Sequence, residues 1–178
     1  MRVFVAIPVP EEIRDRLEDL QADLKVGRLS DPETFHVTLA FLGEEPVDRV
    51  EAAHEALESL SAAPFMIRID GLGSFGGAEP KTLCAAVAPS AGLTALRAKV
   101  RSLLHGAGLM PDRERFRPHV TLARFRPGRA ADPALGRFLT AHAAFGTAPF
   151  PVREVILYRS HLTSGGAVHE ALAEYPLT

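Results

Sequence analysis

The chain has 178 residues, a length at which a single domain is the usual organisation. Hydrophobic residues make up 47% of the chain and charged residues 24%, which is ordinary for a folded globular protein and excludes disordered and collagen-like classes. The net charge of −2 excludes a protein that coats nucleic acid over its whole surface, so any contact with nucleic acid must be local.

The first part of the chain alternates between patterns typical of strands and of helices. Short apolar runs rich in β-branched and aromatic residues predict strands at residues 2–8, 35–42 and 65–70. Apolar residues recur at helical spacing after Pro10 and again at residues 48–60, which predicts two helices between these strands.

The same order begins again in the second part of the chain. The expected elements are two helices, at residues 93–104 and 132–142, and four strands, at residues 82–88, 116–125, 152–160 and 168–175. Both parts therefore run strand, helix, strand, helix, strand. We expect layers of helix and sheet in one domain, 1–178, whose halves at about 1–75 and 80–178 can exchange strands.

A repeated pentapeptide supports this duplication. The sequence HVTLA occupies residues 36–40 and again residues 119–123, at an offset of 119 − 36 = 83 residues. Each copy lies in the second predicted strand of its half. The repeat indicates two units related by a pseudo-twofold axis, with the two strands near that axis.

Each copy contains a His-x-Thr motif. Residues i and i+2 of a strand share a face, so His36 points the same way as Thr38, and His119 the same way as Thr121. In-line displacement at phosphorus needs one group that deprotonates the nucleophile and another that protonates the leaving oxygen. Near pH 7 a neutral imidazole can take up a proton and a protonated imidazole can donate one, so a pair of histidines suits this reaction. The hydroxyls would donate to non-bridging phosphate oxygens, and this scheme needs no metal and no cofactor.

Two other interpretations of the motif are weaker. A single His-x-Thr in a strand is more often structural, but two copies at equivalent positions favour a functional role. A zinc site would need more ligands than two histidines, and no carboxylate stands at ligand spacing beside either one.

The residue that follows the pentapeptide differs between the copies, being Phe41 in the first and Arg124 in the second. Strict alternation would turn both away from the histidine face, although strand ends twist and bulge. If both reach the cleft, Arg124 would hold phosphate and Phe41 would stack on a base. The alternatives are an arginine that extends into solvent and a phenylalanine of the core.

Arginine is concentrated around the second motif. The arginines of this stretch are Arg113, Arg115, Arg117, Arg124, Arg126 and Arg129. Arg115 and Arg117 share strand parity with His119, so we expect them to line the cleft. The cluster would attract a polyanion or, alternatively, protect an exposed strand edge.

The stretch from Gly71 to Gly76 has the spacing Gly-x-Gly-x-x-Gly, but no helix is predicted after it. A pyrophosphate would need the N-terminus of that helix, so we discount a dinucleotide site. We interpret the stretch as a loop that joins the two halves. Phe75, at its tip, is expected to line the cleft or to cover the core.

Together these residues resemble the two-histidine (2H) phosphoesterase superfamily, and within it the bacterial and archaeal RNA 2′,3′-cyclic phosphodiesterases, also called 2′-5′ RNA ligases. The resemblance covers nearly the whole chain. It includes RVFVAI at residues 2–7, HVTLAFLG at 36–43, RPHVTLAR at 117–124 and the C-terminal Leu157-Tyr158-x-Ser160-x-Leu162. In the last predicted strand, His169 stands where a tyrosine is expected in the family.

The resemblance implies an α+β fold of two lobes, each with an antiparallel sheet and helices outside, and histidines that face each other across a central cleft. It implies hydrolysis of RNA 2′,3′-cyclic phosphate ends to 2′-phosphates. His36 would protonate the departing 3′ oxygen and His119 would activate water, although a pseudo-symmetric site could work the other way round. The residues that would hold the substrate are Thr38, Thr121 and Arg124 at the phosphate and Phe41 at the terminal base.

Three other functions could use the same residues. They are 2′-5′ ligation of RNA such as tRNA halves, binding of RNA ends without catalysis, and metal-dependent phosphohydrolysis. We expect RNA ends or nucleotides as partners and no membrane, because no apolar stretch approaches about 18 residues. The lone cysteine, Cys84, excludes a disulfide framework and fits a reducing compartment, and we expect a cytoplasmic monomer.

Overall fold

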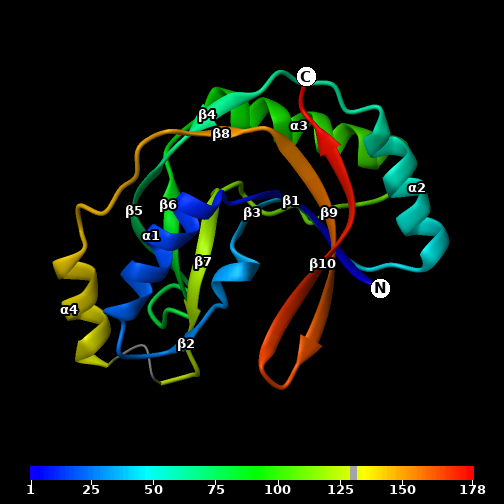
Figure 1. Ribbon diagram of the computed structural model, residues 1–178. Helices are drawn as coiled ribbons and strands as arrows, with labels where there is room; N and C mark the ends of the chain where they lie inside the picture. The colour runs from blue at the N-terminus through cyan, green and yellow to red at the C-terminus, as the bar shows by residue number, and fades with distance from the viewer. Residues whose placement is uncertain (129–131) are drawn as a thin grey trace.

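The structure, a computed structural model, describes residues 1–128 and 132–178 (Figure 1). It contains two four-stranded antiparallel sheets with helices beside them, which confirms the expected α+β class. Arg129 of the arginine stretch lies outside the described residues. Among the helices that are described, none has both the length and the apolar character needed to cross a membrane.

The first sheet, sheet A, joins the two ends of the chain in the strand order β10-β9-β1-β3. Its strands are β1 (Arg2–Pro8), β3 (His36–Glu44), β9 (Glu154–Thr163) and β10 (Gly166–Pro176). β1 pairs with β3 on one side and with β9 on the other. This inner position explains its apolar sequence, because Val3 to Ile7 are all buried.

The second sheet, sheet B, has the strand order β2-β7-β6-β5. Its strands are β2 (Arg28–Leu29), β5 (Ile69–Phe75), β6 (Thr82–Val87) and β7 (His119–Arg124). A separate small sheet pairs β4 (Phe65–Ile67) with β8 (Phe150–Val152). Every sheet therefore combines strands from both halves of the sequence, and we propose that the chain is a single domain for this reason.

The helices are also distributed without regard to the sequence halves. They are α1 (Glu11–Ala22), α2 (Val47–Glu58), α3 (Ala91–Gly106) and α4 (Pro133–Ala141), with a 3₁₀ turn η1 (Pro32–Thr34) before β3. In Figure 1, α1 and α4 lie beside sheet B, and α2 and α3 lie beside sheet A. Thus α3, which follows a strand of sheet B, packs against β3 of sheet A.

Several predicted strand boundaries differ in the structure, and backbone chemistry explains two of these differences. The predicted strand at 65–70 is divided between β4 and β5, and the expected loop after it is wrong because β5 continues to Phe75. Gly71, with a φ of 84°, lies at a register shift that glycine accommodates readily. The predicted strand at 116–125 begins only at His119, because Pro118 has no N–H to donate to a strand ladder.

Strands β3 and β7, which carry the repeated pentapeptide, break strict alternation at the same place. The pairing of β3 with β1 passes from Thr38 directly to Ala40, which leaves Leu39 as a bulge. The pairing of β7 with β6 leaves Leu122, the equivalent residue, as a bulge in the same way. An extra residue in one strand of a pair reverses the alternation of the residues beyond it.

The bulges change which side chains share a face. In both strands the two residues after the threonine are buried, where strict alternation would bury only one of them. The next position, Phe41 in β3 and Arg124 in β7, therefore returns to the face that carries the histidine. The bulges thus explain how Phe41 and Arg124 reach the histidine face, although strict alternation would turn both away from it.

A buried glutamine supports the bulge in β7. Gln21, on α1, is 4% exposed, and its Nε2 donates to the carbonyl oxygens of Leu122 at 2.8 Å and Ser30 at 2.9 Å. The Ser30 amide donates to the same Leu122 carbonyl at 2.9 Å. Because a buried polar group without a partner is costly, this network fixes both the bulge and the position of α1 on sheet B.

We expect Gln21→Met, which keeps the side-chain length but removes both N–H donors, to lower the free energy of unfolding by about 1–3 kcal/mol. Urea denaturation measures the change. Glu18→Gln, an exposed substitution on the same helix, is the control and should alter stability by less than about 0.5 kcal/mol. Equal stability of Gln21→Met and the unmodified protein would contradict a supporting role.

Candidate active site

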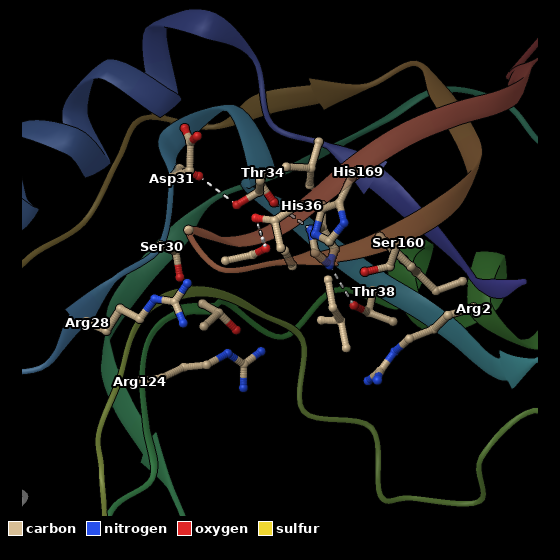
Figure 2. A pocket seen from close by; sticks show the side chains of 18 of the residues that line it. Arg2, Arg28, Ser30, Asp31, Thr34, His36, Thr38, Arg124, Ser160 and His169 are labelled. Atoms are coloured by element: carbon tan, nitrogen blue, oxygen red, sulfur yellow. Dashed lines mark hydrogen bonds between the residues drawn. The ribbon is translucent and has the colours of Figure 1, made fainter.

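A single cleft collects residues from both copies of the repeat. It has a volume of about 620 Å³, and Figure 2 shows it from close by. The sequence-predicted residues that line it are His36, Thr38 and Phe41 from β3 and His119, Thr121 and Arg124 from β7. The two motifs meet there because β3 and β7 contact each other across the two sheets.

The ring of His36 is held by a backbone carbonyl two residues before it. Its Nδ1 lies 2.7 Å from the oxygen of Thr34, in the turn η1. A carbonyl oxygen only accepts, so Nδ1 donates and carries the hydrogen of the neutral ring. Nε2 is then the acceptor nitrogen, and the hydroxyl of Thr38 donates to it at 3.1 Å.

The ring of His119 is held in the same way. Its Nδ1 donates to the carbonyl oxygen of Arg117 at 2.6 Å, again two residues earlier in the chain. The equivalent bond fixes the equivalent tautomer, so the nitrogen left for proton transfer is Nε2 in both rings. The duplication is therefore preserved in the hydrogen bonding as well as in the sequence.

Both imidazoles are harder to protonate than an exposed histidine. Burial lowers the pKa of His36 to about 4; the bond to Thr34 opposes this effect, and nearby His169, His119 and Arg124 add to it. Burial also lowers the pKa of His119, with the carbonyl of Arg117 opposing and the charges of Arg117 and Arg124 assisting. Near neutral pH the free protein therefore holds both rings neutral.

An aromatic cluster surrounds His36. Phe4 of β1 lies 4.7 Å from it between ring centroids and stacks on Tyr158 of β9 at 5.2 Å. His169 of β10 meets His36 edge-on at 5.2 Å, and its buried Nδ1 has no hydrogen-bond partner within the described residues. Strands from both ends of the chain thus build the hydrophobic surroundings that keep His36 neutral.

The other side of the site supports His119 from behind. The ring of Phe75, on β5, lies 4.5 Å from the ring of His119, and the guanidinium of Arg117 lies 4.3 Å above Phe75. Neither Phe75 nor Arg117 is among the residues that line the cleft, so Arg117 differs from the expectation, and for Phe75 the first of its two alternatives does not hold. Arg115 is exposed and does not line it either, because the chain before Pro118 is not a strand and the parity argument does not apply.

Sequence reasoning missed several residues that the structure brings into the cleft. They are Arg2, Phe4, Arg28, Ser160 and His169. Figure 2 shows Arg2 at the opposite end of the cleft from Arg28 and Arg124. The guanidinium of Arg2 lies 5.1 Å from the ring centre of Phe41. Arg2, Phe4 and Ser160 stand in segments that carry the resemblance, and His169 stands where the family's tyrosine is expected. The two-residue strand of Arg28 has no signal in the sequence.

No three histidine, cysteine or acidic side chains gather into a metal-binding group within residues 1–128 and 132–178. The polar groups that the two repeated segments bring into the cleft are instead two imidazoles, two threonine hydroxyls and the guanidinium of Arg124. These groups are proton donors, proton acceptors and anion ligands, and they fit a substrate that contains phosphate.

Two sheets that each bring a strand-borne His-x-Thr motif into a shared cleft define a phosphoesterase of the paired-histidine class. The chain belongs to the 2′-5′ RNA ligase superfamily, whose family model matches residues 9–163. This membership confirms the resemblance found in the sequence.

Individual relatives agree with this assignment. A Thermus thermophilus protein named RNA 2′,3′-cyclic phosphodiesterase is 33% identical over 99% of this chain and 90% of its own length. A Geobacillus stearothermophilus protein of the same name is 32% identical over 98% of this chain, which spans only 56% of that longer relative.

Solved structures share the fold. A crystal structure of a Thermus thermophilus protein matches with a TM-score of 0.79 at 26% identity, over 99% of this chain and 97% of the other. Escherichia coli LigT matches with a TM-score of 0.79 at 24% identity, over 99% of this chain and 98% of the other.

The neutral imidazoles lead to a prediction for the free protein. Nitrogen NMR should give a titration midpoint near 4 for His36 and a midpoint below 6.5 for His119, with Nδ1 carrying the hydrogen in both neutral rings. In Arg124→Gln both midpoints should move up, because a neighbouring positive charge that disfavours protonation is removed. A His36 midpoint at or above 6.5 would contradict the described environment.

Proposed function

We propose that this chain hydrolyses the 2′,3′-cyclic phosphate ends of RNA to 2′-phosphomonoesters, with its two histidines as general acid and general base. The observation that carries the proposal is the shared cleft, in which each imidazole has its Nδ1 engaged by a carbonyl and its Nε2 left for proton transfer. The common name of the curated relatives, RNA 2′,3′-cyclic phosphodiesterase, supports the same reaction.

In the proposed reaction His119 acts on water and His36 on the leaving group. Nε2 of His119 takes a proton from water as the water oxygen attacks phosphorus. The bond from phosphorus to the 3′ oxygen breaks, and protonated His36 gives its proton to that oxygen. The products are a 2′-phosphate and a 3′-hydroxyl, and proton exchange with solvent restores the two rings.

The remaining side chains hold the substrate during this step. Thr121 and Arg124 donate to non-bridging phosphate oxygens, and Thr38 does so when it releases Nε2 of His36. Phe41 is half-buried on the cleft wall, where its exposed face offers a stacking surface for the terminal base.

Substrate binding and protonation of His36 are coupled in this scheme. The free protein keeps His36 neutral, since its pKa is lowered to about 4 by burial and by neighbouring positive charge. A bound cyclic phosphate brings a negative charge next to the ring, which favours the protonated imidazole. The acid therefore forms where the anion is bound.

The reaction is tested with an oligoribonucleotide that ends in a 2′,3′-cyclic phosphate, in the presence of EDTA. We expect the 2′-phosphate product, and a loss of about 10²- to 10⁴-fold in kcat for His36→Ala and for His119→Ala. His161→Ala, at a histidine outside the cleft, is the control and should retain activity. Loss of turnover with EDTA would instead indicate a metal-dependent phosphohydrolase, and tight binding without turnover a module that only binds RNA ends.

The assignment of acid and base has its own test, because two equivalent motifs allow either order. A substrate with sulfur in place of the 3′ bridging oxygen has a leaving group that departs without protonation. We expect this substitution to restore much of the activity of His36→Ala and little of that of His119→Ala. The reverse pattern would exchange the two roles.

Ligation is the second candidate, favoured by the 2′-5′ RNA ligase superfamily model. In that reaction a 5′-hydroxyl of RNA replaces water and gives a 2′-5′ linkage at the same phosphorus. Incubation with tRNA halves, followed by measurement of joined and hydrolysed products, distinguishes the two outcomes.

We also propose a monomer in the cytoplasm. Both motifs come from one chain, so the site is complete without a partner. The single thiol, on Cys84, is buried and has a pKa raised by burial to about 11, so it is unreactive and fits a reducing compartment.

A further inference from the structure

A second groove adjoins the catalytic cleft, and its charged side chains are mainly basic. Among residues 1–128 and 132–178, four cations, on Lys25, Arg28, Arg124 and Arg126, and one carboxylate, on Asp132, line it. Its volume is about 340 Å³. We call it the basic groove. Such a concentration of positive charge is notable in a chain whose net charge is −2.

The protein offsets the positive charge of the basic groove only in part. In the part of the chain that the structure describes, no carboxylate lies within 4.0 Å of any of the four cations. The carboxylate of Asp132 accepts from the Ala134 amide at the start of α4 through Oδ1 and keeps its negative charge, so the groove carries more positive than negative charge. Lys25 donates to the carbonyl of Ala22 at 2.7 Å, which leaves two of its three N–H groups free to bind a ligand.

Two of the arginines connect this groove to the catalytic cleft. Arg28 of β2 and Arg124 of β7 are direct partners in the antiparallel pair, and both also line the cleft with the histidines. Figure 2 shows the two side chains together at one side of that cleft. Like charges placed opposite each other destabilise a strand pair, so this arrangement is explained best by an anion that binds between them.

The floor of the basic groove is tightly packed. Gly27 has a φ of 87°, and a Cβ added there would lie 2.6 Å from the ring of Phe125. Only glycine lets this segment lie so close to the buried phenylalanine, and the packing places Lys25 and Arg28 beside β7. The cations are therefore arranged by the fold and not merely scattered over a loop.

The chemistry of the substrate indicates what enters this groove. An RNA strand that ends in a 2′,3′-cyclic phosphate continues only on its 5′ side, so the next anion is the backbone phosphate of that side. We infer that the basic groove binds this 5′ phosphodiester, so that the enzyme prefers oligoribonucleotides to nucleoside 2′,3′-cyclic phosphates. This inference rests on the proposed function, because the cyclic phosphate occupies the catalytic cleft.

The test compares kcat/KM for a uridine trinucleotide that ends in 2′,3′-cyclic phosphate with kcat/KM for uridine 2′,3′-cyclic phosphate. The ratio should exceed about fivefold in the unmodified protein at low salt and fall as salt is raised. Lys25→Ala and Arg126→Ala, which alter only the basic groove, should each reduce the ratio, and the double variant should bring it near one. Arg153→Ala, an exposed arginine that lines neither groove, should leave it unchanged.

The outcomes separate this inference from the proposed function. Because each variant is judged by the ratio of two substrates, partial unfolding would lower both activities and leave the ratio intact. Equal kcat/KM values in the unmodified protein, or a ratio that Lys25→Ala and Arg126→Ala do not alter, would overturn the role of the basic groove alone. If neither substrate is hydrolysed, the proposed function is wrong and the assignment of the groove falls with it.

Discussion

The arrangement of the site depends on one backbone irregularity that occurs twice, the bulge at Leu39 and Leu122. A regular strand would present histidine and threonine on one face and turn the residue after the pentapeptide to the other. The extra residue reverses the alternation, so that Phe41 and Arg124 join the histidines in the cleft. Because the bulge is repeated with the motif, residues 36–41 and 119–124 present matching side chains to the cleft. They differ only at the last position, which is Phe41 in one strand and Arg124 in the other.

The same duplication explains how two histidines can share the work at one phosphorus atom. Each ring donates from Nδ1 to the carbonyl two residues before it, so both present Nε2 as the reactive nitrogen. The surroundings then differ. Phe4, Tyr158 and His169 enclose His36, whereas Phe75 and Arg117 lie against His119. The proposed reaction gives the two equivalent rings different roles, one as acid and one as base, and their different environments support this division.

Much of the fold and of the site could be predicted from the sequence because the signals were local or repeated. Apolar periodicity located most strands and helices. The two His-x-Thr motifs and the residue after each pentapeptide identified six residues of the cleft. Predictions that extended the alternation of side-chain direction past the end of a regular strand were less reliable. Arg115 and Arg117 were expected in the cleft from alternation, but Pro118 interrupts the ladder before it reaches them. Phe75 was expected in a loop, yet it is the last residue of β5.

The sequence by itself determined the chemical groups of the site, because residue types, their spacing in a strand and their repetition are properties of the chain alone. Only the tertiary structure decided which side chains surround those groups. Phe4 reaches His36 through the pairing of β1 with β3, and His169 reaches it because sheet A joins the two ends of the chain. Arg28 reaches Arg124 through a two-residue strand. Phe4 and His36 lie 32 positions apart in the chain, Arg28 and Arg124 lie 96 apart, and His36 and His169 lie 133 apart. No local pattern encodes these contacts, because they arise from the order of the strands within each sheet.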